Sequence, residues 1–110
     1  MMEIRLARQE DALLISQLIQ TNVEQVVKPY ISSKEFDIWM DAYSQGAVKE
    51  QIQRFYVFML SEGEKLFTTA SLQGDLLAGF YTDANSVGKG YGAQLIQYII
   101  DLRADYRLRS

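Results

Sequence analysis

Cysteine and histidine are both missing from this chain of 110 residues. Without thiols there are no disulfides and no cysteine nucleophile. Without imidazoles the usual zinc sites and the commonest general base are also lost. We therefore expect no metal site, and any acid–base chemistry must use a carboxylate, a tyrosine, a lysine, water or the substrate itself.

A basic face and a long apolar run are missing as well. Acidic residues outnumber basic ones by 14 to 11, for a net charge of −3, whereas a nucleic-acid partner demands a basic surface. No apolar run approaches the roughly 18 residues of a membrane span, and residues 1–8 show no secretory signal. The apolar fraction of 48% suits one globular domain, residues 1–110. We expect a cytoplasmic protein that binds neither nucleic acid nor membranes.

A strand and a helix begin the predicted series of elements. Residues 3–7 alternate polar and apolar, as a half-buried strand does. Apolar positions then recur at helical spacing over residues 12–26, after Asp11, which is expected to cap this helix. Lys28 and Pro29 should end the helix, because the residue before a proline avoids helical geometry.

A second helix is predicted after Ser32, which forms a capping-box pattern with Glu35. Gly46 is its expected end, and residues 47–54 are expected to add a further helical turn or two. The apolar face of the second helix consists of Phe36, Trp39, Met40 and Tyr43.

Three strands and a long helix complete the series. Turn signals separate the strands, which cover residues 55–60, 66–72 and 76–82 and predict an antiparallel meander. The last helix runs from Tyr91 to about Leu108, with an apolar stripe formed by Leu95, Ile99, Leu102 and Tyr106. The expected fold class is α/β (α+β): a mixed, mainly antiparallel sheet in the order β-α-α-β-β-β-α.

Between the last strand and the last helix stand three glycines, at positions 88, 90 and 92. Glycines let successive N–H groups point into one concavity, and the helix adds the positive end of its dipole, so the ligand implied is a phosphate or pyrophosphate. A nucleotide P-loop is excluded, because Asp83 stands where a glycine is needed and Gly90 where Ser or Thr is needed. A dinucleotide fingerprint is excluded by the G-x-G-x-G spacing and by the antiparallel strands.

The glycine segment, residues 87–92 (VGKGYG), resembles the acetyl-CoA pyrophosphate loop of the GNAT N-acetyltransferases, usually written Arg/Gln-x-x-Gly-x-Gly/Ala. Residues 2–11 look like the first strand of that family and the entry to its first helix, and residues 80–83 look like the end of its fourth strand. The resemblance implies a GNAT-like fold, acetyl-CoA as cosubstrate, and acetyl transfer to an unidentified amine.

Carried over by position, the resemblance also implies roles for single residues. The strand backbone at Tyr81 and Thr82 would hydrogen-bond the pantetheine arm, and the loop amides would hold the pyrophosphate. Lys89 would either meet the ribose 3′-phosphate of coenzyme A or remain a solvated surface residue. The implied cofactor-binding residues are Tyr81, Thr82, Val87, Gly88, Lys89, Gly90, Tyr91, Gly92 and Ala93.

The chain departs from the family pattern in two respects. Val87 stands where the family usually has Arg or Gln, and Ala84 and Ser86 replace the common Pro and aromatic residues. The chain also stops at Ser110, whereas complete members continue with a fifth strand, another helix and usually two further strands. The resemblance is therefore to a C-terminally truncated member that lacks the half which often supplies a tyrosine acid.

No catalytic residue is assigned from the sequence. Four carboxylates are candidate bases, although a turn-forming or solvated role is the favoured interpretation of each; these candidates are Glu62, Glu64, Asp75 and Asp83. The aromatic residues of the second helix line an acceptor pocket or pack in the core; these are Phe36, Trp39 and Tyr43.

Without a fifth strand, residues 76–82 would form an unpaired sheet edge, and the last helix would expose part of its apolar surface. We therefore expect a homodimer in which a second copy covers these surfaces. Three functions stay open: an N-acetyltransferase, a non-catalytic coenzyme A-binding or dimeric interaction module, and a structural protein in which the glycine loop is only a connection.

Overall fold

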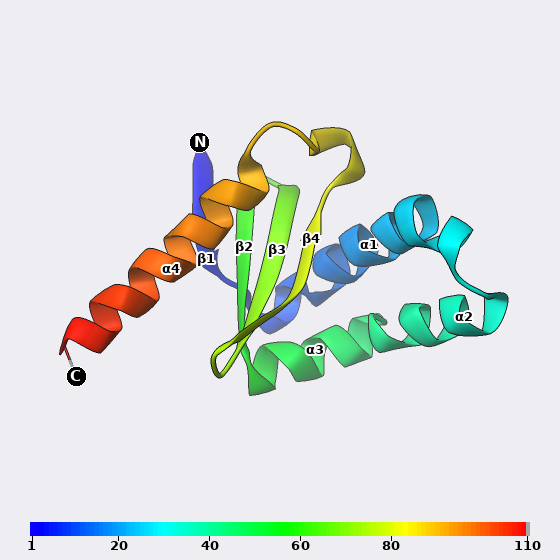
Figure 1. Cartoon of the computed structure of the whole chain (residues 1–110), viewed down its shortest axis with the longest axis horizontal. Helices are drawn as coiled ribbons and strands as arrows, with labels where there is room; N and C mark the ends of the chain where they lie inside the picture. The colour runs from blue at the N-terminus through cyan, green and yellow to red at the C-terminus, as the bar shows by residue number, and fades with distance from the viewer. Residues whose placement is uncertain (110) are drawn as a thin grey trace.

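The computed structural model describes the backbone of residues 1–109 and the side chains of residues 1–104, so the predicted stripe residue Tyr106 lies outside the described side chains. All pairings in the four-stranded sheet are antiparallel, and the strand order is β1-β2-β3-β4. The predicted meander is therefore confirmed, and the first strand joins it beside β2 (Figure 1). The strands are β1 (Met2–Leu6), β2 (Tyr56–Glu62), β3 (Lys65–Gln73) and β4 (Leu76–Thr82).

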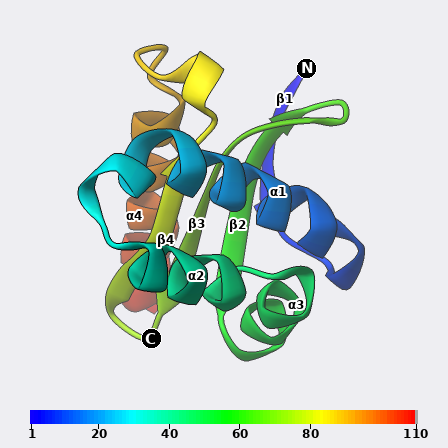
Figure 2. The same ribbon diagram turned by 90° about the vertical axis from the view of Figure 1, so that its right-hand side faces the viewer.

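Helices cover both faces of the sheet (Figures 1 and 2). The helices α1 (Ala12–Asn22), α2 (Ser33–Ala42) and α3 (Gln45–Arg54) lie on one face, and α4 (Tyr91–Arg109) lies on the other. Two cores result, because successive residues of a strand point to opposite faces. The core under α1 and α3 includes Ile15, Ile19, Val23, Val48, Val57 and Met59, and the core under α4 consists of Phe58, Ala70, Leu95 and Ile99.

Asp11 lies at the start of α1, but its side chain does not cap that helix. Its carboxylate accepts two hydrogen bonds from the Arg5 guanidinium, at 2.8 and 3.0 Å, and one from the Arg8 backbone N–H at 2.7 Å. The hydrogen bond from Arg5 is the main reason why the pKa of Asp11 lies below its usual value. Asp11 therefore ties β1 to the turn before α1, which corrects its predicted role as the helix cap.

The end of α1 also differs from the prediction. After Asn22 the chain continues as a π-helical turn over Val23–Val27 and then as a 3-10 turn over Lys28–Tyr30. Lys28 keeps helical angles, φ −48° and ψ −41°, although Pro29 follows it. Proline is accepted here because it stands in the first turn of a helix, where its missing N–H needs no partner. The α- and π-helical run thus ends before Lys28 and Pro29, as expected, but the reason expected for that end is wrong, because Lys28 does adopt helical geometry.

The capping box of α2 is confirmed, whereas the boundary after it is corrected. The Glu35 N–H donates to Ser32 Oγ at 3.1 Å, and the Ser32 N–H donates to Glu35 Oε1 at 3.2 Å. Gly46 does not end this helix but lies in the first turn of α3. The cap of α3 is Ser44, whose Oγ accepts a hydrogen bond from the Ala47 N–H at 3.2 Å. Within the part of the chain that the structure describes, no helix is long and apolar enough to cross a membrane.

Candidate functional site

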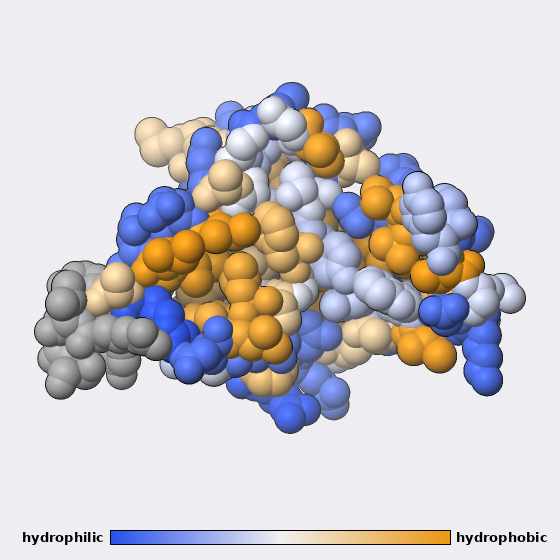
Figure 3. Space-filling model, viewed as in Figure 1, coloured by the Kyte–Doolittle hydropathy of each residue, from blue (hydrophilic) through white to orange (hydrophobic). Residues whose placement is uncertain are grey.

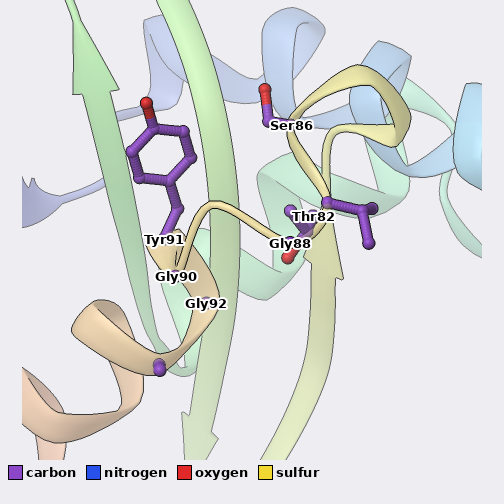
Figure 4. A pocket seen from close by; sticks show the side chains of 8 residues that line it. Thr82, Ser86, Gly88, Gly90, Tyr91 and Gly92 are labelled. Carbon is purple, nitrogen blue, oxygen red and sulfur yellow. The ribbon is translucent and has the colours of Figure 1, made fainter.

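A cavity of about 410 Å³ opens where β4 passes into α4 (Figure 4). It is lined by Thr82, Ser86, Val87, Gly88, Gly90, Tyr91, Gly92 and Ala93. All of these except Ser86 are among the residues predicted to bind a cofactor. Tyr81 and Lys89, which were also predicted, are not part of the lining. The structure therefore brings most of the predicted residues around one space, and their contact with a ligand stays a prediction.

Two of the loop glycines adopt backbone angles that other residues avoid. Gly88 has φ +88° and Gly90 has φ +81°, and no atom lies within 4 Å of the position that a Cβ would take at either residue. Gly90 accepts a hydrogen bond from the Gln94 N–H at 3.0 Å, which closes the first turn of α4. The N–H groups of that turn have no acceptor within the helix, so the positive end of α4 lies beside the cavity.

Gly92 has a different role from the one the loop pattern suggests. A Cβ at this residue would lie 2.6 Å from Phe80 Cζ and 3.3 Å from Thr82 Oγ1. The first turn of α4 therefore lies directly against β4, so close that a larger residue at position 92 would have to displace the Phe80 ring. This glycine serves the packing of helix on strand.

The loop is held in place by Asp83, the residue that follows β4. Its N–H donates to the Phe67 carbonyl at 2.7 Å, and its carboxylate accepts a hydrogen bond from Ser86 Oγ at 2.9 Å. The Lys65 ammonium lies 3.3 Å from the same carboxylate. Ser86 was missed in the sequence, although a serine three residues after an aspartate is a recognisable turn signal. These contacts give Asp83 a structural role at the base of the loop.

The β4 backbone at Tyr81 and Thr82 was predicted to bind an extended ligand arm. In the structure the Tyr81 carbonyl accepts a hydrogen bond from Thr68 Oγ1 at 2.8 Å, and the Thr82 carbonyl accepts one from Asn22 Nδ2 at 3.0 Å. The Tyr81 ring turns to the other face of the sheet and meets Tyr43 edge to face, with centroids 5.4 Å apart. Burial, together with the hydrogen bond to Tyr43, raises the pKa of the Tyr81 hydroxyl above its ordinary value.

Neither a family model nor a curated protein matches this sequence, but solved structures do match the fold. PaiA N-acetyltransferase from Thermoplasma acidophilum, solved with coenzyme A, has a TM-score of 0.84 at 15% identity, over 96% of this chain and 74% of that one. A GCN5-related N-acetyltransferase from Rhodopseudomonas palustris has a TM-score of 0.81 at 20% identity, over 94% and 66%. This chain has the GNAT fold.

A third match is part of a much longer protein. N-acetylglutamate synthase from Neisseria gonorrhoeae, solved with coenzyme A and N-acetyl-glutamate, has a TM-score of 0.62 at 21% identity, over 92% of this chain and 22% of that one. The mixed α/β fold class expected from the sequence is thus confirmed. Among the described residues α4 is the last element, and no fifth strand follows it. That the chain is a truncated GNAT protein stays a prediction.

The remaining candidate bases lie at the end of β2, which is Glu62, and in two turns of the sheet, which hold Glu64 and Asp75. Asp75 contacts Arg103 of α4, and Arg103 Nη1 also donates to the Gly74 carbonyl at 2.9 Å, so this group holds the β3–β4 turn against the helix. This turn is at the opposite end of β4 from the cavity (Figure 1). Glu62 lies 3.7 Å from the N-terminal amine, and Glu64 stands in the exposed β2–β3 turn.

The aromatic residues of α2 are placed by the structure in a packing role. Phe36 and Trp39 are half-buried against the core under α1 and α3, together with Tyr43 just after the helix. Among the described residues no group of three or more carboxylates is arranged to hold a metal ion.

The close approach at Gly92 predicts a stability effect that depends on Phe80. We expect Gly92→Ala to destabilise the protein by about 1 kcal/mol, because the new methyl group must displace the Phe80 ring. In a Phe80→Ala background the same change should stabilise it by up to about 1 kcal/mol, because alanine favours helix over glycine. Urea unfolding of the four proteins measures both values.

The matched control is Gly46→Ala in the first turn of α3, where no atom lies within 4 Å of the new Cβ. It should be stabilising whether or not Phe80 is present. An effect of Gly92→Ala that is the same in both Phe80 backgrounds would contradict this account of the packing.

Proposed function

We propose that this chain binds a coenzyme A thioester, acetyl-CoA, in the cavity between β4 and α4. The observation that carries the proposal is the open, glycine-lined space beside the N-terminus of the 19-residue α4. A diphosphate would accept hydrogen bonds from the first-turn N–H groups and would be stabilised by the helix dipole. The coenzyme A found with two of the matched GNAT structures supports this ligand.

The residues around the cavity fit an anion in charge as well as in shape. Asp83 is the acidic group nearest to the loop in sequence, and its carboxylate already pairs with Lys65 and Ser86. Its negative charge is thereby offset before any ligand arrives. Gly88 and Gly90 have no side chain to block the loop, so phosphate oxygens would approach its backbone directly. Lys89 is exposed on the same loop and is the candidate partner for a further phosphate group.

The activity proposed is transfer of the acetyl group to an amine. The amine nitrogen attacks the thioester carbonyl carbon, the carbon–sulfur bond breaks, and the proton lost by the amine is balanced by one gained by the thiolate. We assign no acid or base in this chain, because Asp83 is ion-paired and the Tyr81 hydroxyl is engaged with Tyr43. Because both side chains are already engaged, one alternative is favoured, namely a coenzyme A-binding module without turnover.

Substitution of Gly90 tests the binding proposal. We expect acetyl-CoA to titrate saturably into the wild-type protein in a calorimeter. Gly90→Glu should weaken binding at least about 10-fold, because the new carboxylate would fill part of the cavity and repel the phosphates of the ligand. Once binding is established, acetyl transfer to a panel of amines is assayed. Binding without transfer would select the non-catalytic alternative.

Gly74→Glu is the matched control for this substitution. Gly74 also has a positive φ, +65°, and also has open space around it, but it stands in the turn at the far end of β4. It therefore introduces the same charge and the same backbone strain away from the cavity. Equal loss of binding in both variants, or no binding by the wild type, would contradict the proposed site.

We further propose that a second copy of the chain packs against the exposed apolar side chains of α4 and β4 and leaves the Thr82 carbonyl, at the end of the strand, open to the ligand. The strand β4 is an edge of the sheet, and apolar side chains are exposed along both elements: Leu76 at 62%, Phe80 at 41%, Ile100 at 54% and Leu102 at 47%. Figure 3 shows apolar surface gathered over this part of the molecule. An unpaired edge beside exposed apolar side chains is a surface that favours association.

Sedimentation equilibrium at micromolar concentration tests this dimer. The wild type should sediment as a dimer, and Ile100→Lys should sediment as a monomer, because a lysine would place a charge in the apolar contact. Leu13→Lys is the control, since Leu13 is 48% exposed on α1 at the opposite face of the sheet. A monomeric wild type, or a dimer that Ile100→Lys leaves intact, would exclude this interface.

A further inference from the structure

A side chain of α1 reaches the rim of the cavity. Asn22, the last residue of α1, donates a hydrogen bond from Nδ2 to the Thr82 carbonyl at 3.0 Å, across 60 residues of sequence. Thr82 is the last residue of β4 and is part of the cavity lining. This contact therefore joins the helical layer on one face of the sheet to the place where the ligand is proposed to bind.

The Thr82 carbonyl lies on the open edge of the sheet. The Tyr81 carbonyl and the Asp83 N–H both form hydrogen bonds with β3, to Thr68 and Phe67. Backbone groups of successive strand residues alternate in direction, so those of Thr82 point away from β3. An edge carbonyl of this kind is a ready acceptor for an amide N–H from an extended ligand.

Asn22 presents to this carbonyl the same chemical group that an amide-bearing ligand arm would present. We propose that Asn22 is an internal competitor: its carboxamide occupies the Thr82 carbonyl in the free protein, and an amide of the pantetheine arm displaces it on binding. The inference rests on the proposed binding of a coenzyme A thioester, and adds a residue that sets the affinity of that site.

The position of Asn22 allows its side chain to leave without disturbing the core. Ile19 on α1 and Val23, the first residue of the π-helical turn, are 3% and 0% exposed and hold this segment on the sheet, whereas Asn22 is only half-buried. The regular α-helix also ends at Asn22, where the π-helical turn Val23–Val27 begins. Such turns interrupt the regular hydrogen-bond ladder and are frequent at functional sites.

Removal of the competitor should strengthen binding. We expect Asn22→Ala to bind coenzyme A roughly 2- to 10-fold more tightly than the wild type in calorimetric titration, the factor that one neutral hydrogen bond represents. Gln20→Ala is the matched control. Gln20 Nε2 also donates from α1 to a backbone carbonyl at 3.0 Å, but its acceptor is Met40 in α2, so its loss should leave the affinity unchanged.

A second ligand separates two effects of the substitution: the loss of competition for the Thr82 carbonyl, and a general change in the loop. ADP carries a diphosphate but no amide-bearing arm, so its affinity should be the same in the wild type and both variants. Coenzyme A binding that is unchanged or weaker in Asn22→Ala, or an equal gain for ADP, overturns the role of Asn22 alone. If neither the wild type nor Asn22→Ala binds coenzyme A, the proposed function fails and this inference fails with it.

A measurement on the wild type covers the case in which the variant does not fold. In ¹H–¹⁵N NMR spectra the side-chain amide resonances of Asn22 should shift as coenzyme A is added and should stay in place when ADP is added. The Gln20 side-chain resonances should not move with either ligand. An Asn22 amide that is unmoved by saturating coenzyme A overturns the proposal.

Discussion

The direct contact of α4 with the edge strand β4 is the constraint on which the cavity depends. Because residue 92 is glycine, with the position of a Cβ only 2.6 Å from the Phe80 ring, the helix begins over the strand without displacing that ring. The N-terminus of α4 is thereby brought beside the end of β4, next to Thr82. A positive helix end and the end of an open strand then border one space. The candidate anion site is thus a consequence of how one helix packs.

The polar groups near that contact are paired with one another. The Asp83 carboxylate is balanced by Lys65 and held by Ser86, which fixes the path of the loop without leaving a free negative charge beside the cavity. The Thr82 carbonyl is satisfied by Asn22. Of these, the Asn22 bond is made by a neutral group at an open edge, which is why we propose that a ligand replaces it, whereas the Asp83 contacts hold the loop.

Much of the fold was readable from local patterns. The change from helical to alternating spacing located the strands, the Ser32–Glu35 box located α2, and the glycines located the loop and the start of α4. The wrong boundary at Gly46 and the wrong reason for the helix end before Pro29 arose because both residues stand in first turns, where helices accept them.

Other features depend on contacts that no short window contains. Asn22 and Thr82 are 60 residues apart, and the need for glycine at residue 92 comes from Phe80 on another element. The same holds for Asp11, whose side chain turned back to Arg5 of β1 instead of capping α1. The glycines identify the loop in the sequence, but the role of each glycine is explained only by the contacts in the fold.

The central claim is that the loop and first-turn amides beside the cavity bind the diphosphate of a coenzyme A thioester. The most direct measurement is a ¹H–¹⁵N NMR titration of the wild-type protein with coenzyme A, followed at the backbone amides of residues 88–93. We predict saturable shifts concentrated at these amides, with smaller changes in α2 and α3. Saturable shifts elsewhere that leave residues 88–93 unmoved, or no saturable shift at all, would contradict the account.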